Sequence, residues 1–209
     1  MIPATLPPRI RTLPKDPASG YPVPWFVAWF DGKPDFRVVD HVKLVRAVKE
    51  RRCMICGGVL GRYLAFAIGP MCAINRVSSE PPSHTDCATF AAKVCPFLAN
   101  PSKPRRETDL PENDGMAGEG LKRNPGVVLV WVTKHYAPFR APGGAGVLFQ
   151  IGPAEEWFWF AQGREATRAE VQASIDSGLP ILKEAAKVDG AEAALELAAA
   201  SALRYLPKE

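Results

Sequence analysis

Two pairs of potential metal ligands constrain the fold of this chain more than any other feature. Cys53 and Cys56 are separated by two residues, and His84 and Cys87 form a second pair with the same spacing. Cysteine and histidine pairs with this spacing build tetrahedral structural zinc sites. We therefore predict that one structural Zn²⁺ ion organises the N-terminal half of the chain, with these four residues as its ligands.

Each pair has a local geometry that suits a shared ion. The first pair would lie on a tight turn, or knuckle, in which Gly57 adopts a positive φ. The second pair belongs in the first turn of a helix, with Ser83 as the candidate N-cap. Residues three apart on a helix rise about 4.5 Å and lie on one face, so both side chains can reach the same ion.

The other cysteines leave alternatives open. Cys72 follows a predicted strand, and it replaces His84 as the fourth ligand if the end of that strand lies near the knuckle. Cys95 lies eight residues beyond Cys87, about 12 Å along a continuous helix, so we expect it to be a buried thiol in the core. The five cysteines could also be ordinary reduced thiols, or two disulfides with one cysteine left over.

Cysteine usage and hydropathy favour a cytoplasmic protein. An odd number of cysteines argues against the disulfide framework of a small secreted domain. Residues 1–16 lack the apolar core of a signal peptide. No stretch approaches the roughly 20 apolar residues that span a bilayer. We expect a soluble, cytoplasmic protein without a membrane partner.

Charge is divided unevenly between the two halves. Residues 1–106 contain 16 Lys and Arg against 7 Asp and Glu, whereas residues 107–209 contain 10 against 15. A basic surface around the zinc site would suit an anionic partner, of which nucleic acid is the commonest. The alternative is that these cations only solvate the outer face of a helix. The candidate nucleic-acid-binding residues are Lys43, Arg46, Lys49, Arg51, Arg52, Arg62 and Arg76.

Local patterns predict a hairpin and a helix before the knuckle. Residues 25–30 and 35–39 flank a turn that contains Asp-Gly, which is typical of a β-hairpin. Asp40 is a candidate cap for a helix that ends near Arg51. The apolar residues expected to form the buried stripe of this helix are Val42, Leu44, Val45 and Val48.

Residues 63–68 alternate as a strand does, and they connect the knuckle to the segment that leads back to the second ligand pair. Knuckle, hairpin-like excursion and ligand-bearing helix, in that order, resemble the treble-clef family of zinc-binding domains over residues 52–97. This resemblance implies a metal site. The sequence of residues 80–90 and 95–97 is also similar to small proteins of phages and their bacterial hosts, which implies no particular function.

Treble clefs include nucleases of the His-Asn-His type, and this sequence departs from that pattern. The family's activity implies a histidine at the hairpin that activates water, but none lies between Cys56 and His84. The polar run over residues 75–80 could contact phosphate or a small ligand, or its Asn and Ser side chains could bond to their own backbone. Because no nucleophile, base and orienting group can be named together, we lean against an enzyme.

The C-terminal half is predicted to form a small sheet packed with helices. Its apolar runs at residues 127–132, 147–151 and 157–160 are typical of strands. Trp157 and Trp159 alternate with Phe158 and Phe160, so one pair would face the core and the other solvent or a partner. Helices are expected over residues 167–178, 181–188 and 191–205, the first of them opened by a capping box.

These features predict an α+β fold, in which a treble-clef-like zinc domain with a β-hairpin and a helix precedes the small sheet. The expected parts are an extended arm (1–20), a zinc-binding domain (21–99), a linker (100–125) and a small α+β domain (126–209) that could pack as one body with the first. A nucleic-acid-associated zinc protein is the leading function, and it predicts salt-sensitive binding. The alternatives are a protein-interaction module that acts on a host factor, and an enzyme that acts on nucleic acid or a nucleotide.

Overall fold

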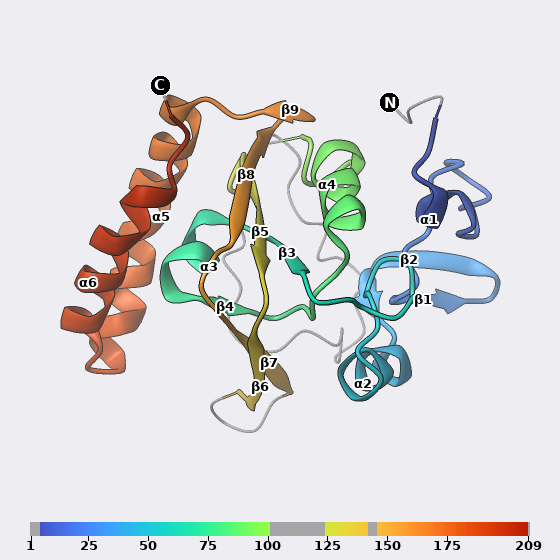
Figure 1. The fold of residues 1–209 in the computed structure, drawn as a ribbon, viewed down its shortest axis with the longest axis horizontal. Coiled ribbons are helices and arrows are strands. Elements are labelled where there is room, and N and C mark those ends of the chain that lie inside the picture. Colours follow the sequence, from blue (N-terminus) through green and yellow to red (C-terminus); the bar gives the residue numbers. More distant parts are fainter. Residues whose placement is uncertain (1–4, 101–123, 142–145, 209) are drawn as a thin grey trace.

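The computed structural model describes residues 5–100, 124–141 and 146–208, so most of the predicted linker at residues 100–125 lies outside the described residues. Its elements confirm the predicted α+β class, with helices and three small antiparallel sheets in the described part of the chain. The N-terminal elements lie on one side of a central sheet, and the two long C-terminal helices lie on the other (Figure 1).

The predicted β-hairpin is present near the N-terminus. Strands β1 (Val27–Phe30) and β2 (Lys33–Val39) pair antiparallel. Asp31 and Gly32 connect them with φ angles of 48° and 76°. Two consecutive residues with positive φ match the right-handed twist of the paired strands, which explains why an Asp-Gly turn closes this hairpin.

Helix α2 (His41–Lys49) follows the hairpin and is capped by Asp40 as predicted, because its side chain accepts a hydrogen bond from the backbone N–H of Lys43 at 3.1 Å. The predicted buried stripe is wrong in part, since Val42 and Val45 are 70% and 49% exposed. Only one narrow face of this nine-residue helix packs against the protein, and two of its apolar residues lie outside that face. The residues of that face, at i, i+3 and i+4, are Leu44, Ala47 and Val48.

The segment predicted as an extended arm contains a short helix, α1 (Pro8–Arg11). Ile10, which is 1% exposed, packs in one apolar cluster with Cys53, Leu64 and Cys87. The cluster therefore places the N-terminal segment directly against the predicted metal ligands.

The central sheet has the strand order β3-β5-β8-β9. Phe66 lies opposite Trp131 in the first pair of strands, and Trp131 lies opposite Trp157 in the second. The uninterrupted apolar sequence of β5 is explained by its position, because all six of its residues are buried. Strands from both predicted domains thus share one sheet. Their bounds are β3 (Leu64–Ile68), β5 (Val128–Thr133), β8 (Glu156–Ala161) and β9 (Arg164–Glu165).

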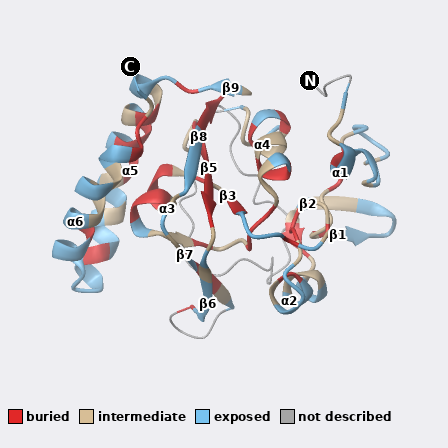
Figure 2. Ribbon diagram, viewed as in Figure 1, coloured by how far each residue is buried: buried red, intermediate tan, exposed pale blue. Residues whose placement is uncertain are grey.

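Helices cover both faces of this sheet. Helix α4 (Thr85–Val94) packs two small residues, Ala88 and Ala92, against Val128 and Val130 on one face. Figure 2 shows the buried residues that run along β5 and the exposed residues that cover most of α6. The elements on the other face are α3 (Pro70–Asn75), α5 (Arg168–Val188), α6 (Glu192–Ala202) and a 3-10 turn (Leu203–Tyr205).

A second sheet lies at one end of the first, in the order β4-β7-β6. Residues 147–151 form a strand as predicted, but β7 pairs with β4 and β6 and not with the strands of the central sheet. Strand β4 was not predicted, because a strand of two residues is too short to show an alternating pattern. The strands are β4 (Val77–Ser78), β6 (Tyr136–Arg140) and β7 (Val147–Ile151).

Helix α5 is longer than predicted, since it continues through Pro180 as one helix of 21 residues. The predicted capping box is confirmed, because the side chain of Thr167 and that of Glu170 each bond to the backbone of the other residue. A proline inside a helix costs about 3 kcal/mol. Burial of Ile175, Gly178 and Ala186 against the core on both sides of the proline offsets this cost.

Candidate metal centre

The knuckle around Cys53 is a tight hairpin held by backbone hydrogen bonds. The N–H of Cys53 donates to the carbonyl of Gly58, and the N–H of Gly57 donates to the carbonyl of Cys53, both at 2.8 Å. Gly57 has a φ of +71°, as predicted, and a Cβ at this position would lie 2.8 Å from the ring of Trp25. Any other residue at this position would be strained and would collide with the tryptophan.

The second ligand pair is positioned by a short contact with β3. Ser83 and Ala65 exchange two backbone hydrogen bonds, at 2.7 and 2.8 Å, so the chain returns antiparallel to the strand that leaves the knuckle. Ser83 is therefore not the N-cap. His84 occupies that position, and α4 begins at the next residue. Cys87 follows in the first turn of the helix, on the side that faces the knuckle.

The structure brings Cys53, Cys56, His84 and Cys87 together. Their ligand atoms all lie within 4.8 Å of one another. Nδ1 of His84 lies 3.3 Å from Sγ of Cys56 and 4.0 Å from Sγ of Cys87. Ligand atoms that surround one zinc ion tetrahedrally lie about 3.5–3.8 Å apart, so small side-chain movements would complete the geometry. The cluster could hold a metal ion such as zinc.

A contact behind the imidazole fixes how it faces the sulfur atoms. Nε2 of His84 lies 3.0 Å from the carbonyl oxygen of Val59. A carbonyl only accepts, so Nε2 carries the proton and donates, which leaves the lone pair of Nδ1 directed at the thiols. Outer hydrogen bonds of this kind orient histidine ligands in metal sites.

The electrostatics of the cluster favour a thiolate on Cys53. The pKa of Cys53 lies below its usual range because the thiols of Cys56 and Cys87 and two backbone N–H groups direct hydrogen bonds at its sulfur. The pKa of Cys56 and that of Cys87 are raised, chiefly by their interaction with Cys53. Cys53 and Cys87 are fully buried, so a cation at the centre would be the natural neutralising partner.

The other two cysteines lie apart from this group. Cys72, the alternative fourth ligand, is in α3 and packs against the core cluster on the far face of the sheet. Burial, with a smaller contribution from the charge of Glu80, raises the pKa of the Cys72 thiol to about 11. Cys95 forms the C-cap of α4 and is partly exposed, whereas a buried thiol was predicted. The helix ends at this residue, so the apolar stripe does not continue through it.

Several predicted nucleic-acid-binding residues contact acidic groups of the protein itself. Lys43 lies 3.3 Å from the carboxylate of Asp40 and donates to a backbone carbonyl. Arg46 and Arg52 both pair with Glu50, and their hydrogen bonds lower the pKa of its carboxyl to about 2. Two carboxylates therefore balance two of the three positive charges in this group.

Arg76 lies between the sheet and the C-terminal helices. Its guanidinium is 4.0 Å from the ring centre of Trp131, and it donates to the carbonyl of Gly152 and to the hydroxyl of Tyr205. These contacts join the end of α3 to the sheet and to the C-terminal 3-10 turn. Lys49, Arg51 and Arg62 are different, because their side chains are exposed and form no side-chain hydrogen bond or ion pair with other described residues.

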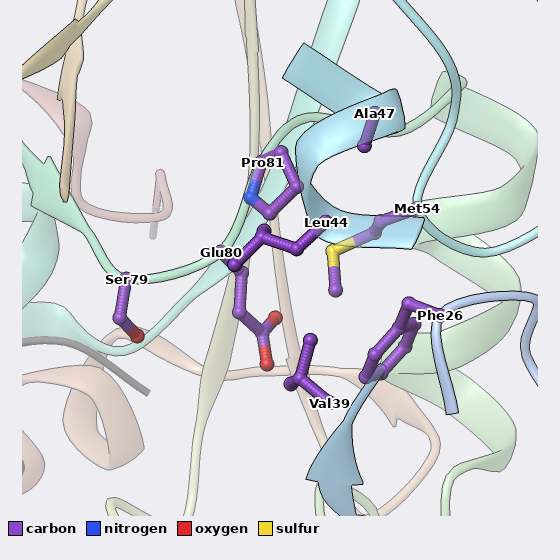
Figure 3. Close-up of a pocket in the computed structure, with 8 residues that line it drawn as sticks. All are labelled: Phe26, Val39, Leu44, Ala47, Met54, Ser79, Glu80 and Pro81. Atoms are coloured by element: carbon purple, nitrogen blue, oxygen red, sulfur yellow. The ribbon is translucent and has the colours of Figure 1, made fainter. Parts of the chain in front are cut away.

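The polar run over residues 75–80 bonds mainly to its own backbone. The side chain of Asn75 accepts from the N–H of Val77, and that of Ser78 bonds to both the N–H and the carbonyl of Glu80. Glu80 also extends toward Val39 in a small pocket beside α2 (Figure 3). The pocket has a volume of about 10 Å³, which is room for one water but not for an organic substrate.

The prediction that the aromatic residues of β8 divide between the two faces of the strand is wrong. The buried ones lie at the end of the strand and the exposed ones at its beginning. Trp159 and Phe160 are 7% and 4% exposed, whereas Trp157 and Phe158 are 38% and 43% exposed. Strand β9 pairs with β8 only at Phe160 and the residue after it, so the beginning of β8 is left at the edge of the sheet.

No helix in the described ranges is both long enough and apolar enough to cross a membrane. The geometry above identifies one cluster that could bind a metal and three exposed arginine or lysine residues on or near the knuckle. Comparison with models of protein families, with curated proteins and with solved structures found no match for this chain.

Proposed function

We propose that this chain is a zinc-stabilised protein that associates with nucleic acid. The observation that carries the proposal is the position of the exposed cations relative to the ligand cluster. Leu60 donates its N–H to the carbonyl of Arg51 at 2.8 Å, so Arg51 lies across the knuckle hairpin from Leu60, and Arg62 follows two residues later. The loop that a metal would order thus presents two arginines to solvent.

The donor set supports zinc as the metal. Three thiols and one imidazole suit zinc, and four protein ligands leave no open position for water. The metal would therefore be structural. The order of knuckle, β3, returning segment at Ser83 and ligand-bearing helix supports a domain of the treble-clef type. The similarity to phage and bacterial proteins is an expectation from the sequence, and neither the choice of zinc nor the domain type depends on it.

The charge distribution supports an anionic partner. The first 106 residues are strongly basic, and Lys49, Arg51 and Arg62 have no acidic partner among the described residues that would neutralise them. Arginine and lysine contacts to phosphate release counterions, so the association should weaken steeply as salt increases. The proposal includes no catalysis, because His84 is assigned to the metal and the pocket beside Glu80 has room for one water.

Metal analysis of the purified protein, together with gel mobility shift in a salt series, tests this function. We expect about one zinc ion per chain and binding that falls steeply from about 50 to about 200 mM salt. The double variant Arg51→Ser with Arg62→Ser should reduce the slope of log affinity against log salt by about 2. The control is Lys183→Ser, an exposed cation in the acidic half. A metal-free folded protein, or no mobility shift at low salt, would overturn the proposal.

One observation favours a second candidate, a protein-interaction module. The hairpin and α2 expose several large apolar side chains, namely Trp29, Phe30, Phe36, Val42 and Val45. Exposed apolar groups at this density are typical of protein contacts. This alternative predicts one stable protein partner and little affinity for nucleic acid, so the same salt series separates the two functions.

A further inference from the structure

We infer that the nucleic acid is single-stranded and that an unpaired base stacks on Tyr63. This inference rests on the proposed function, and it names the substrate class and the surface that recognises it. The surface, which we call the Tyr63 patch, consists of Arg51, Arg62, Tyr63 and Lys134.

Tyr63 is an exposed aromatic ring next to cations that come from two parts of the chain. It is 50% exposed and immediately precedes β3. Leu64 is opposite Thr133 in the antiparallel pair, which brings Tyr63 and Lys134 to the same end of the sheet. Nζ of Lys134 lies 5.5 Å from the ring centre of Tyr63. Lys134 also pairs with Glu155 at 2.6 Å, so its charge is balanced in part and, within the described residues, the unpaired positive charge beside the ring comes from arginine.

The two arginines complete the patch. Arg62 is the neighbour of Tyr63 in the chain, and its side chain is exposed. Arg51 lies across the knuckle hairpin from Leu60, whose N–H donates to the carbonyl of Arg51 at 2.8 Å. Leu60 precedes Tyr63 by three residues, so Arg51 lies beside the loop that leads to the ring. The ring of Tyr63 therefore has the ammonium group of Lys134 on one side and, on and beside the loop that leads to it, two arginines that are unpaired among the described residues, Arg51 and Arg62.

An exposed ring surrounded by cations suits a single strand better than a duplex. An aromatic side chain stacks on a base only when that base is unpaired, while nearby cations contact the backbone phosphates. Duplex readers commonly place a helix with free cations in the major groove. Helix α2 has three Lys and Arg side chains, but Lys43 and Arg46 pair with Asp40 and Glu50, so Lys49 alone among them is unpaired within the described chain.

The metal ligands support this patch directly. Val59 belongs to the loop that carries Arg62 and Tyr63, and its carbonyl accepts the hydrogen bond from His84. Arg52 and Val59 form a β-bridge on the other side of the knuckle. Removal of the metal would release the imidazole and with it the loop, so binding of a single strand should require the metal.

Fluorescence anisotropy with a labelled thymidine oligonucleotide, a uridine oligonucleotide and a DNA duplex of the same length tests the inference. We expect either single strand to bind more tightly than the duplex. Tyr63→Leu keeps apolar bulk but removes the ring, and it should weaken binding of the single strand by about tenfold, whereas Tyr63→Phe should bind like the wild type. The matched control is Phe36→Leu, which alters an exposed ring on the hairpin and should change nothing. Metal content and circular dichroism check that each variant is folded.

The outcomes distinguish this inference from the function on which it rests. If the duplex binds as tightly as the single strands, or if Tyr63→Leu binds like the wild type, the inference is overturned and the proposed function stands. If neither single strand nor duplex binds at low salt, the proposed function fails and the inference fails with it.

Discussion

Nε2 of His84 lies 3.0 Å from the carbonyl oxygen of Val59, on the loop that follows the knuckle. One imidazole thus contacts both ligand pairs, because its Nδ1 faces the thiols of Cys56 and Cys87. This double contact makes the histidine a bridge between the knuckle and α4, in addition to the ligand role that we propose for it.

Substitution of His84 should remove the metal. We expect His84→Ala to lower zinc content as much as Cys53→Ala does, since each leaves three ligands. His84→Cys should retain zinc, because it restores a fourth donor. Cys72→Ser is the control, since Cys72 lies outside the cluster. Plasma mass spectrometry measures the zinc content of each variant. Full zinc content in His84→Ala would contradict the assignment of His84 as a ligand.

Chelation should unfold the N-terminal lobe and not merely remove an ion. Binding free energy at a structural site of this kind contributes directly to folding. Ile10, Leu64 and the buried ligands share one apolar cluster, so loss of the knuckle should also release α1. Hydrogen exchange with and without chelator measures this, and unchanged protection around Ile10 would show that the cluster is stable without metal.

Ile10→Ala should destabilise the protein by about 2–4 kcal/mol, because it leaves a cavity in a closely packed cluster. Ile10 is 1% exposed. The matched control is Val42→Ala, at a position that is 70% exposed, and it should change the free energy of unfolding by less than about 0.5 kcal/mol. Denaturant titration compares the two variants. Equal effects would mean that the N-terminal segment does not pack as described.

Cys72 should resist alkylation in the native protein. Its pKa of about 11 leaves almost no thiolate at neutral or mildly alkaline pH, and the thiolate is the reactive form. Iodoacetamide followed by peptide mass spectrometry should modify Cys72 only after denaturation. Modification of native Cys72 at the rate of an exposed thiol would contradict the burial.

The capping box of α5 should stabilise the protein in a pH-dependent way. The ion pair with Arg164 and hydrogen bonds from Thr167 lower the pKa of Glu170 to about 2, against an ordinary value of 4.5. The stabilisation is therefore complete above pH 4.5 and declines as pH falls toward 2. Glu170→Gln should lower the free energy of unfolding by about 1 kcal/mol at pH 7.

Thermal unfolding at a series of pH values tests this expectation. The difference between wild type and Glu170→Gln should shrink as pH falls from 4.5 toward 2. Glu196→Gln is the control, because Glu196 is exposed on α6 and forms no ion pair with described residues. A difference that stays constant with pH would show that the carboxylate charge is unimportant there.

Features set by a few neighbouring residues could be predicted from the sequence. The Asp31-Gly32 turn, the Asp40 cap and the Thr167 capping box each depend on bonds within a few residues, and all are present. The four residues of the two predicted ligand pairs also lie together, since a knuckle and a helical turn fix each pair locally.

Features set by distant contacts could not be predicted. Strand β7 joins β4, which lies about 70 residues earlier, and no local pattern encodes that choice. No helix is predicted directly after the strand at residues 63–68, but Pro70 begins α3, because proline is suited to the first turn of a helix. The burial of Ile10 likewise depends on a cluster whose other members come from the knuckle and α4.

Because β3 pairs with β5, folding of the C-terminal half depends on the strand that leaves the knuckle. A fragment that starts at residue 124 would leave one edge of β5 without its neighbour, and that edge belongs to a strand with every residue buried in the intact chain. Such an edge readily pairs with other copies and aggregates. During synthesis, β3 should therefore already be folded when β5 leaves the ribosome, so that β5 pairs with β3 and not with another chain.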